Sequence, residues 1–160
     1  MICRIVVLMR TVLFICTGNT CRSPLAEGIA QKLSDNGQLP KELGNIFFAS
    51  AGVAAMDGAP TSEETVAVLE RMNAPVPEHA KRLTAAMIRA ADLVLGMTAT
   101  HVARAQAMVG HDLDVCSRIV AIDPDGDIAD PIGLGQRAYD KLGEHFSELI
   151  PKRLSGMLIT

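Results

Sequence analysis

Residues 11–16 (TVLFIC) form a continuous apolar run rich in residues that favour β-strands. Because the run is apolar almost throughout, and not only at alternate positions, it predicts a strand buried on both faces. The run leads into a turn signal at residues 17–19 (TGN), and a helix is expected from Pro24 with Ser23 as its N-cap. That helix would carry an apolar stripe of Leu25, Ile29 and Leu33. A buried strand that leads directly into a helix is typical of parallel α/β sheets.

The rest of the chain alternates between strand and helix patterns. Further strands are expected at residues 45–51, 92–97 and 115–122. Helices are expected after a capping box at residues 61–64, after Thr84, over residues 99–109, and in a last segment that carries Tyr139, Leu142, Phe146 and Leu149 on one face and ends or kinks at Pro151. We therefore predict an α/β fold: a single doubly wound domain over residues 9–160, with a four-stranded parallel sheet flanked by helices on both faces. Residues 1–8 are interpreted as an N-terminal extension.

The composition argues against several classes of function. The formal net charge is −3, and the aromatic residues are one Tyr and four Phe, so neither a basic patch nor base stacking supports nucleic-acid binding. No segment approaches the ~20 apolar residues of a membrane span. The four cysteines match neither a secreted disulfide scaffold nor a zinc site with paired ligands. This pattern predicts reduced thiols in a cytoplasmic protein.

The segment between the first strand and the first helix has the pattern Cys-x5-Arg-Ser, and we call it the phosphate loop (residues 16–23). Backbone N–H groups of a curled loop and of the helix start that follows it form a concave anion site. Arg22 supplies a planar fork for two phosphate oxygens, and the same positive surroundings favour the nucleophilic thiolate of Cys16. Ser23 can donate a hydrogen bond to that sulfur. The predicted phosphate-binding residues are Thr17, Gly18, Asn19, Thr20, Cys21, Arg22 and Ser23.

A cysteine at a strand end is also compatible with a simple core position. Here a buried strand, a glycine turn, the Cys-x5-Arg spacing and a helix start coincide, which favours a nucleophile at Cys16. A P-loop nucleotide-binding protein is excluded, because no Gly-Lys-Ser/Thr sequence follows the loop.

Transfer of a phosphoryl group to a thiolate also needs an acid that protonates the departing group. Asp130, which precedes Pro131, is the candidate, because its loop follows the fourth strand and should emerge beside the phosphate loop. An Asp-Pro pair is also a common turn. Spacing alone does not choose between Asp130 and its neighbours Asp123, Asp125 and Asp127.

Several segments together resemble the low-molecular-weight protein tyrosine phosphatase family: the phosphate loop, residues 50–52 (SAG), the strand at 91–97 and residues 130–133 (DPIG). The resemblance runs from residue 9 to the last helix. It implies Cys16 as nucleophile, Arg22 as phosphate clamp, Asn19 and Ser23 as support for the loop and thiolate, and Asp130 as general acid and then base. It also implies a phosphocysteine intermediate, no metal and no cofactor, phosphorylated proteins as substrates and inorganic phosphate as product.

Within that resemblance, Thr20 bears on the phosphorylated residue. Tyrosine phosphatases of the family commonly carry a bulky aliphatic residue there, and the loop with residues 91–98 (ADLVLGMT) is more similar to the bacterial protein arginine phosphatases. A threonine is shorter and offers a hydroxyl, which predicts phosphoarginine as substrate. Phosphotyrosine remains the alternative. Ile132, where relatives usually have an aromatic residue beside the substrate, weakens both interpretations.

Other interpretations follow from single residues. An arsenate reductase shares this fold and loop but needs a close pair of further thiols, and here only Cys116 remains downstream. A non-catalytic phosphate-binding module would be expected to lack the nucleophile or the acid. Cys21 is expected either to trap oxidised Cys16 as a disulfide or simply to pack in the core. A role for His79 in bracing Asn19 is not expected, and the sequence predicts surface positions for His101, His111 and His145.

Overall fold

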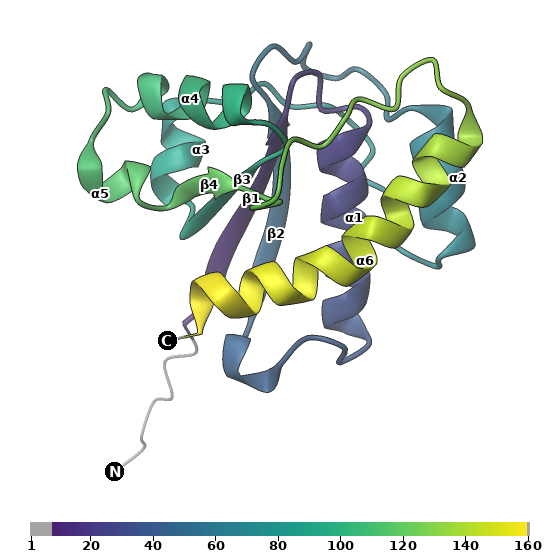
Figure 1. Ribbon diagram of the computed structural model, residues 1–160, viewed down its shortest axis with the longest axis horizontal. Coiled ribbons are helices and arrows are strands. Elements are labelled where there is room, and N and C mark those ends of the chain that lie inside the picture. Colours follow the sequence, from purple (N-terminus) through teal and green to yellow (C-terminus); the bar gives the residue numbers. More distant parts are fainter. Residues whose placement is uncertain (1–7, 160) are drawn as a thin grey trace.

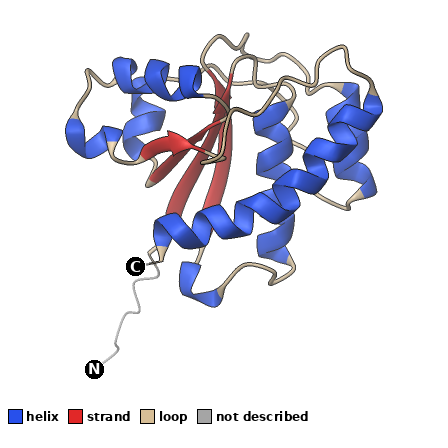
Figure 2. Ribbon diagram, viewed as in Figure 1, coloured by secondary structure: helices blue, strands red, loops and turns tan. Residues whose placement is uncertain are grey.

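The computed structural model describes residues 8–159, which fold around a parallel four-stranded sheet (Figure 1, Figure 2). In chain order the strands are β1 (Arg10–Cys16), β2 (Ile46–Gly52), β3 (Leu93–Gly96) and β4 (Ile119–Ala121). Their order across the sheet is β2-β1-β3-β4, so the chain first moves to one side of β1 and then to the other. The predicted doubly wound α/β fold is confirmed. Its switch point, where such folds bind ligands, lies between β1 and β3.

Helices cover both faces of the sheet, as expected (Figure 1). On one face lie α1 (Arg22–Asp35), α6 (Gln136–Leu158) and, packed against both of these, α2 (Glu63–Arg71). The other face carries α3 (Ala85–Ala90), α4 (Ala99–Met108) and α5 (Leu113–Cys116). A short 3-10 helix, η1 (Lys41–Leu43), precedes β2.

Strand β1 is buried on both faces, as its apolar run predicts. Val12, Phe14 and Cys16 belong to the hydrophobic core beneath α1 and α6. Leu13 and Ile15, which alternate with them, belong to the core on the opposite face. This alternation follows from the two-residue period of a strand. It also places Cys16 at the carboxyl end of the central strand, facing the same core as α1.

The first residues of α1 and α2 differ from those predicted from the sequence. Helix α1 begins at Arg22, with Cys21 as an N-cap that makes no side-chain capping bond, so Ser23 lies inside the helix. In α2 the N-cap is Ser62, whose hydroxyl accepts a hydrogen bond from the Thr65 N–H, and not the first residue of the predicted capping box. The predicted cap of α3 is confirmed, because the Thr84 hydroxyl accepts from the Met87 N–H.

Two further differences lie in the second half of the chain. The predicted strand at residues 115–122 is divided: its beginning forms the end of α5, and only Ile119–Ala121 pair as β4. The last helix runs through Pro151 to Leu158 and does not end there. Ile150 and Leu154, on either side of the proline, are fully buried, so packing of this face offsets the backbone hydrogen bond that proline removes.

The expected inward face of α6 is confirmed. Tyr139 and Phe146 are buried, and Leu142 and Leu149 pack against the same core. The predicted N-terminal extension falls outside the described residues except for Leu8, which is exposed. Among residues 8–159, no helix has the length and apolar character that a membrane crossing requires.

Candidate active site

The thiol of Cys16 lies at the end of β1 with two hydrogen-bonding groups close to its sulfur. The Ser23 Oγ lies 2.9 Å from Cys16 Sγ, and the Asn19 N–H donates to the same sulfur over 3.3 Å. Cys16 itself is only 2% exposed. Groups that can donate to sulfur stabilise its anionic form, so this arrangement suits a thiolate.

The phosphate loop folds as a tight curve against β2. Asn19 has a positive φ of 54°, which turns its N–H back toward Cys16. Gly52 allows the loop to approach: a Cβ there would lie 2.5 Å from the Thr17 carbonyl oxygen and 2.9 Å from the Asn19 nitrogen. Within the described residues, the N–H groups of Gly18 and Thr20 have no hydrogen-bond partner. A curled loop with free N–H groups at a helix start is an anion site.

Asn19 is held by three hydrogen bonds from its side chain. Its Nδ2 donates to Ser23 Oγ at 2.8 Å and to Ser50 Oγ at 2.9 Å, and its Oδ1 accepts from the Lys81 N–H at 2.9 Å. Since Ser23 Oγ accepts from Asn19, its hydrogen can be donated to Cys16 Sγ at 2.9 Å, which is nearer than its other acceptor, the Ala51 carbonyl oxygen at 3.5 Å. The backbone N–H of Lys81, and not the His79 side chain, therefore braces Asn19.

Ser50 extends this network to α1. Its hydroxyl donates to the Glu27 Oε2 over 2.6 Å while it accepts from Asn19. Burial raises the pKa of Glu27, and the Ser50 hydrogen bond only partly opposes this effect. Ser50 and Glu27 were not predicted as site residues, although Ser50 belongs to the segment 50–52 (SAG) that carries part of the family resemblance. Only the pairing of β1 with β2, which sets Phe14 opposite Ser50, brings them to the loop.

Arg22 is buried and connects the phosphate loop to the loop after β4. Its Nη1 donates to the Ile128 carbonyl oxygen at 2.9 Å, and its Nη2 lies 3.6 Å from the Asp130 Oδ2. The Asp130 side chain is 47% exposed, whereas that of Arg22 is 7% exposed. The guanidinium is thus fixed in place, and a carboxylate at the rim of the site lies beside it.

The structure distinguishes the four candidate aspartates. Asp127 accepts a hydrogen bond from the Ala99 N–H, and Asp123 is paired with His145. Asp125 does not line the hollow at the phosphate loop. That hollow is about 180 Å³ in volume, and its lining consists of Cys16, Thr17, Gly18, Thr20, Cys21, Arg22, Asp130 and Ile132. Asp130 is therefore the one of the four that shares a cavity with the thiol.

Cys21 is buried beside the loop. Its sulfur lies 3.4 Å from the Tyr139 hydroxyl and 3.6 Å from the Thr20 Oγ1. Burial and the hydrogen bond with Cys21 raise the pKa of Tyr139, so this phenol stays protonated. Cys16, Cys21 and Cys116 are free thiols, and Cys116 packs in the opposite core.

His101 is not at the surface, contrary to the sequence prediction, although His111 and His145 are exposed. It is 3% exposed, and its Nε2 lies 2.8 Å from the Thr17 Oγ1. Gly96 permits this packing, since a Cβ at this position would lie 2.9 Å from the Cγ2 and 3.2 Å from the nitrogen of Val102, the residue after His101. The first turn of α4 therefore packs closely on the end of β3, beside the phosphate loop.

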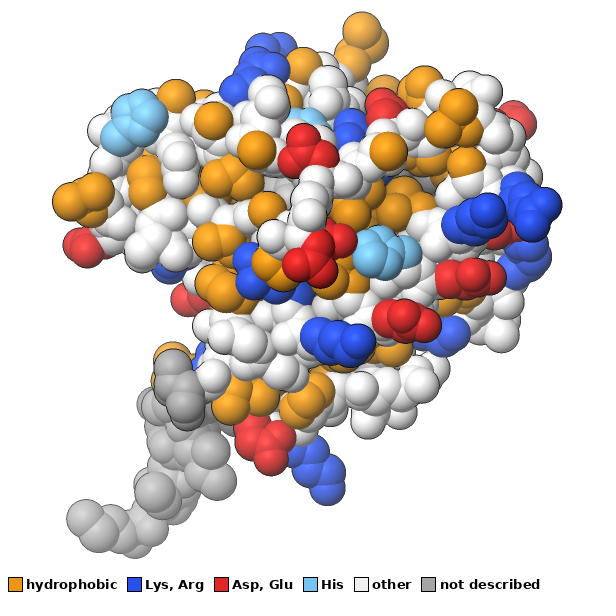
Figure 3. Space-filling view, in the orientation of Figure 1, with side chains coloured by type: hydrophobic (Ala, Val, Ile, Leu, Met, Phe, Trp, Pro, Cys, Tyr) orange, Lys and Arg blue, Asp and Glu red, His pale blue; other side chains and the backbone are white. Residues whose placement is uncertain are grey.

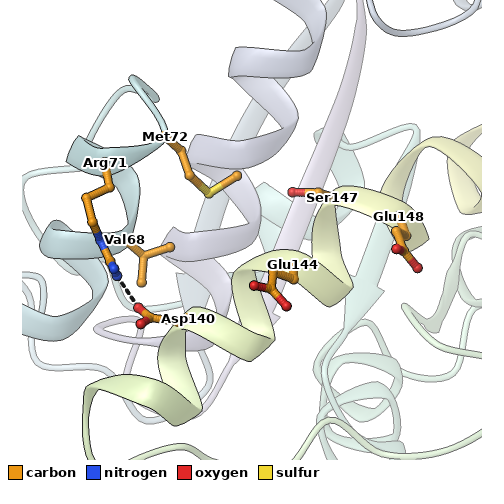
Figure 4. Close-up of a pocket in the computed structure, with 7 residues that line it drawn as sticks. All are labelled: Val68, Arg71, Met72, Asp140, Glu144, Ser147 and Glu148. Atoms are coloured by element: carbon orange, nitrogen blue, oxygen red, sulfur yellow. Dashed lines mark hydrogen bonds and ion pairs between the residues drawn. The ribbon is translucent and has the colours of Figure 1, made fainter.

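A larger hollow, with a volume of about 480 Å³, lies elsewhere, between α2 and α6 (Figure 4). Its lining includes Asp140, Glu144 and Glu148 with one cation, Arg71, which pairs with Asp140. Acidic and basic side chains alternate over this part of the surface (Figure 3). Carboxylates repel phosphate, so the smaller hollow at the phosphate loop is the better anion site.

Among residues 8–159 no cluster of three or more His, Cys, Asp or Glu side chains could hold a metal ion. The phosphate loop instead offers a cation, free N–H groups and a thiol. Together with the doubly wound fold, these features define the class of cysteine-based phosphatases.

Comparison with known proteins agrees with that class. The profile described as low molecular weight phosphotyrosine protein phosphatase matches residues 11–157. The chain is 34% identical over 139 residues to the low molecular weight protein-tyrosine-phosphatase PtpB of Staphylococcus haemolyticus, covering 87% of this chain and 94% of the relative. It is 29% identical over 141 residues to the protein-arginine-phosphatase of Bacillus subtilis, with coverages of 87% and 91%.

The solved structures give the same result. A YwlE arginine phosphatase variant with a phosphorylated active-site serine superposes with a TM-score of 0.81 at 26% identity, covering 91% of this chain and 94% of that one. The chain therefore belongs to the low molecular weight phosphotyrosine protein phosphatase family. It is a cysteine-based phosphatase, and its relatives carry the names of both tyrosine and arginine phosphatases.

Proposed function

We propose that this enzyme hydrolyses phosphoarginine in proteins through a phosphocysteine intermediate at Cys16. The observation that carries the choice of substrate is Thr20, a small hydroxyl residue on the wall of the hollow that contains the thiol. The catalytic roles of Cys16, Arg22 and Asp130, and a cytoplasmic location, are part of the same proposal.

In the first step the Cys16 thiolate attacks phosphorus, and the bond from phosphorus to the guanidinium nitrogen breaks. Arg22 and the N–H groups of the loop bind the phosphoryl oxygens, whose charge grows in the transition state. Asp130, in its protonated form, donates its proton to the departing nitrogen. Its half-exposed position at the rim, 3.6 Å from the Arg22 Nη2, supports this role.

In the second step a water molecule attacks the phosphocysteine. The Asp130 carboxylate takes a proton from this water, the sulfur–phosphorus bond breaks and inorganic phosphate leaves. The sulfur departs as a thiolate, and the Ser23 hydroxyl and the Asn19 N–H stabilise it. The phosphorylated active-site serine of the YwlE variant supports a covalent route of this kind.

Specificity rests on the part of the hollow lined by Thr20 and Ile132. Among residues 8–159 the one hydrogen-bond partner of the Thr20 Oγ1 is the soft Cys21 sulfur, at 3.6 Å, so this hydroxyl can still hydrogen-bond to a polar substrate. An aryl ring would gain nothing from that group, and Ile132, which is aliphatic, offers aromatic stacking to neither substrate. The Thr20 hydroxyl therefore favours a polar guanidinium over a phenyl ring.

Three variants at Thr20 test this specificity. Thr20→Val removes the hydroxyl at constant shape, and Thr20→Ile also fills the space. We expect Thr20→Ile to lower kcat/KM for phosphoarginine protein by about one to two orders of magnitude, because a lost polar contact and a clash together cost ~1–3 kcal/mol. Thr20→Val should show the polar part of that loss alone. The matched control is Thr20→Ser, which keeps the hydroxyl and should stay nearest to wild type in its substrate ratio.

Activity on phosphotyrosine should hold or rise in Thr20→Ile. A wild-type preference for phosphotyrosine, or equal losses on both substrates, would leave a tyrosine phosphatase as the function. An arsenate reductase is less well supported, because Cys116 packs in the core on the opposite face of the sheet from Cys16. Arsenate-dependent oxidation of thioredoxin would reveal such an activity.

A further inference from the structure

His101, which is buried, contacts the exposed residue Thr17 at the mouth of the phosphate loop, and none of the proposed catalytic steps uses this contact. The Nε2 of His101 lies 2.8 Å from the Thr17 Oγ1, and Thr17 lines the hollow that contains the thiol. His101 belongs to α4, far from the loop in sequence. The pair therefore links the phosphate loop to the opposite layer of the sheet.

The tautomer of His101 follows from its second contact. The Thr98 N–H donates to His101 Nδ1 at 3.1 Å, while the Thr98 hydroxyl accepts from the His101 N–H at 3.2 Å, which makes a capping box. A nitrogen that accepts a hydrogen bond carries no hydrogen, so the ring proton lies on Nε2. His101 is therefore a donor to Thr17, and the Thr17 oxygen accepts.

This direction decides where the Thr17 hydrogen goes. Within the described residues, the Thr17 hydroxyl has no other side-chain partner than His101, so its own hydrogen is free. The hydroxyl lies at the wall of a hollow whose lining also includes the Arg22 guanidinium, the Thr20 hydroxyl and the Asp130 carboxylate. A phosphoryl oxygen in that hollow is the natural acceptor for one more donor.

We propose that His101 is a positioning residue: as a fixed Nε2–H donor it orients the Thr17 hydroxyl so that Thr17 donates its hydrogen to a phosphoryl oxygen in the loop. The inference rests on the proposed phosphatase site. It does not depend on which phosphorylated residue the enzyme prefers.

The surroundings of His101 agree with a ring that is neutral at neutral pH. Burial lowers the pKa of His101 to about 4, and the Arg22 guanidinium lowers it further in the same direction. Arg104 of α4 acts likewise, whereas Asp127 and Asp130 in the loop after β4 oppose these effects. The donor is thus present at every pH at which the thiolate chemistry is expected.

A double-mutant cycle tests the pair, with the affinity for inorganic phosphate as the first measurement. In His101→Asn the side-chain oxygen can replace Nδ1 as the acceptor for the Thr98 N–H. The shorter side chain no longer reaches the Thr17 hydroxyl. Thr17→Val removes the hydroxyl at constant shape. We expect each change to weaken phosphate binding by about tenfold, as for the loss of a hydrogen bond to a charged acceptor. The double variant should be no weaker than either single variant, since both break the same contact.

A second measurement is kcat/KM for an aryl phosphate. Thr17→Ser should recover the affinity that Thr17→Val loses. Thr84→Ala is the matched control, because it removes the helix cap of α3 at a site away from the phosphate loop. It should leave the phosphate affinity and kcat/KM unchanged. Unchanged phosphate affinity in His101→Asn, or losses that multiply in the double variant, would overturn the inference.

The wild-type protein gives a test that needs no variant. In 15N NMR spectra at pH 6 to 8, the His101 ring should show a protonated Nε2 and an unprotonated Nδ1, and added phosphate should shift the Nε2 signal. The reverse tautomer or a doubly protonated ring would overturn the inference even if His101→Asn fails to fold.

Discussion

The two loops that meet at the active site differ in how firmly the fold holds them. The phosphate loop is fixed from behind: Asn19, Ser23 and Ser50 are at most 2% exposed and joined by hydrogen bonds. The loop between β4 and α6 is open to solvent, and there Asp130 has a half-exposed side chain and Ile132 is 63% exposed. The groups that we propose bind phosphate are therefore preorganised, whereas the proposed acid and part of the proposed substrate wall lie on a more adaptable segment.

This contrast suggests a division of labour. Stabilising charge on the phosphoryl group requires donors fixed before the reaction, which the buried network provides. Accepting different protein substrates requires a rim that can adjust, which an exposed loop with positive-φ glycines at Gly133 and Gly135 provides. Changes in the first region should remove the chemistry itself, and changes in the second should depend on the substrate.

The largest effect is expected from Cys16→Ser. Without a thiolate, turnover of an aryl phosphate should fall by far more than about a hundredfold. Binding of inorganic phosphate should persist, because Arg22 and the loop N–H groups remain. Steady-state kinetics and phosphate titration check these two results. Retention of more than about a hundredth of the wild-type rate would show that Cys16 is not the nucleophile.

Asp130→Asn should have the next largest effect, and one that depends on the leaving group. For a poor leaving group the rate should fall by ~10²–10⁴-fold, since the departing atom needs the proton. For a good leaving group such as nitrophenolate the loss should be much smaller. Equal losses on both kinds of substrate would assign the acid role to another residue, and the same variant made at Asp125 is the matched control.

A smaller effect concerns stability against pH. The pKa of His101 is lowered by burial from 6.5 to about 4 in the folded protein, so the unfolded chain binds its proton first as the pH falls. The contribution of neutral His101 is complete above pH 6.5 and is lost as the pH falls toward 4. Between pH 7 and pH 5 this should remove about 2 kcal/mol of the free energy of unfolding.

Urea unfolding at the two pH values measures that loss. His101→Asn should remove the His101 part of the pH dependence while keeping that of Glu27, whose raised pKa acts in the opposite direction in both proteins. Equal pH dependence in the two proteins would show that His101 does not titrate in this way.

The phosphate loop was predictable because its parts are consecutive in the sequence: strand, turn, Cys-x5-Arg and helix start. The network behind Asn19 was not, since Ser50 and Glu27 reach it only through strand pairing and helix packing. His101 could have been found. Thr98 is a good N-cap, and a polar side chain three residues later is a capping-box signal, which predicts a ring directed back toward the strand end.

At Pro151 a clear local signal in the sequence did not predict where the helix ends. Local chemistry predicts a helix end or kink there, but burial of Ile150 and Leu154 carries α6 through the proline. The short β4 has a similar origin: Asp112 caps the turn of α5 inside a segment that favours strand by composition. Where tertiary packing or a single cap sets the bounds of a helix or strand, the periodicity of the sequence alone does not predict them.

If phosphoarginine is hydrolysed through a covalent bond to Cys16, rapid quenching should trap that bond. Wild-type enzyme mixed with excess phosphoarginine protein and quenched within the first turnover should carry one phosphate on Cys16, located by mass spectrometry of the quenched peptides. The label should disappear as substrate is consumed and should not form in Cys16→Ala. Release of phosphate from phosphoarginine at the full rate with no label on Cys16 at any time would contradict the account.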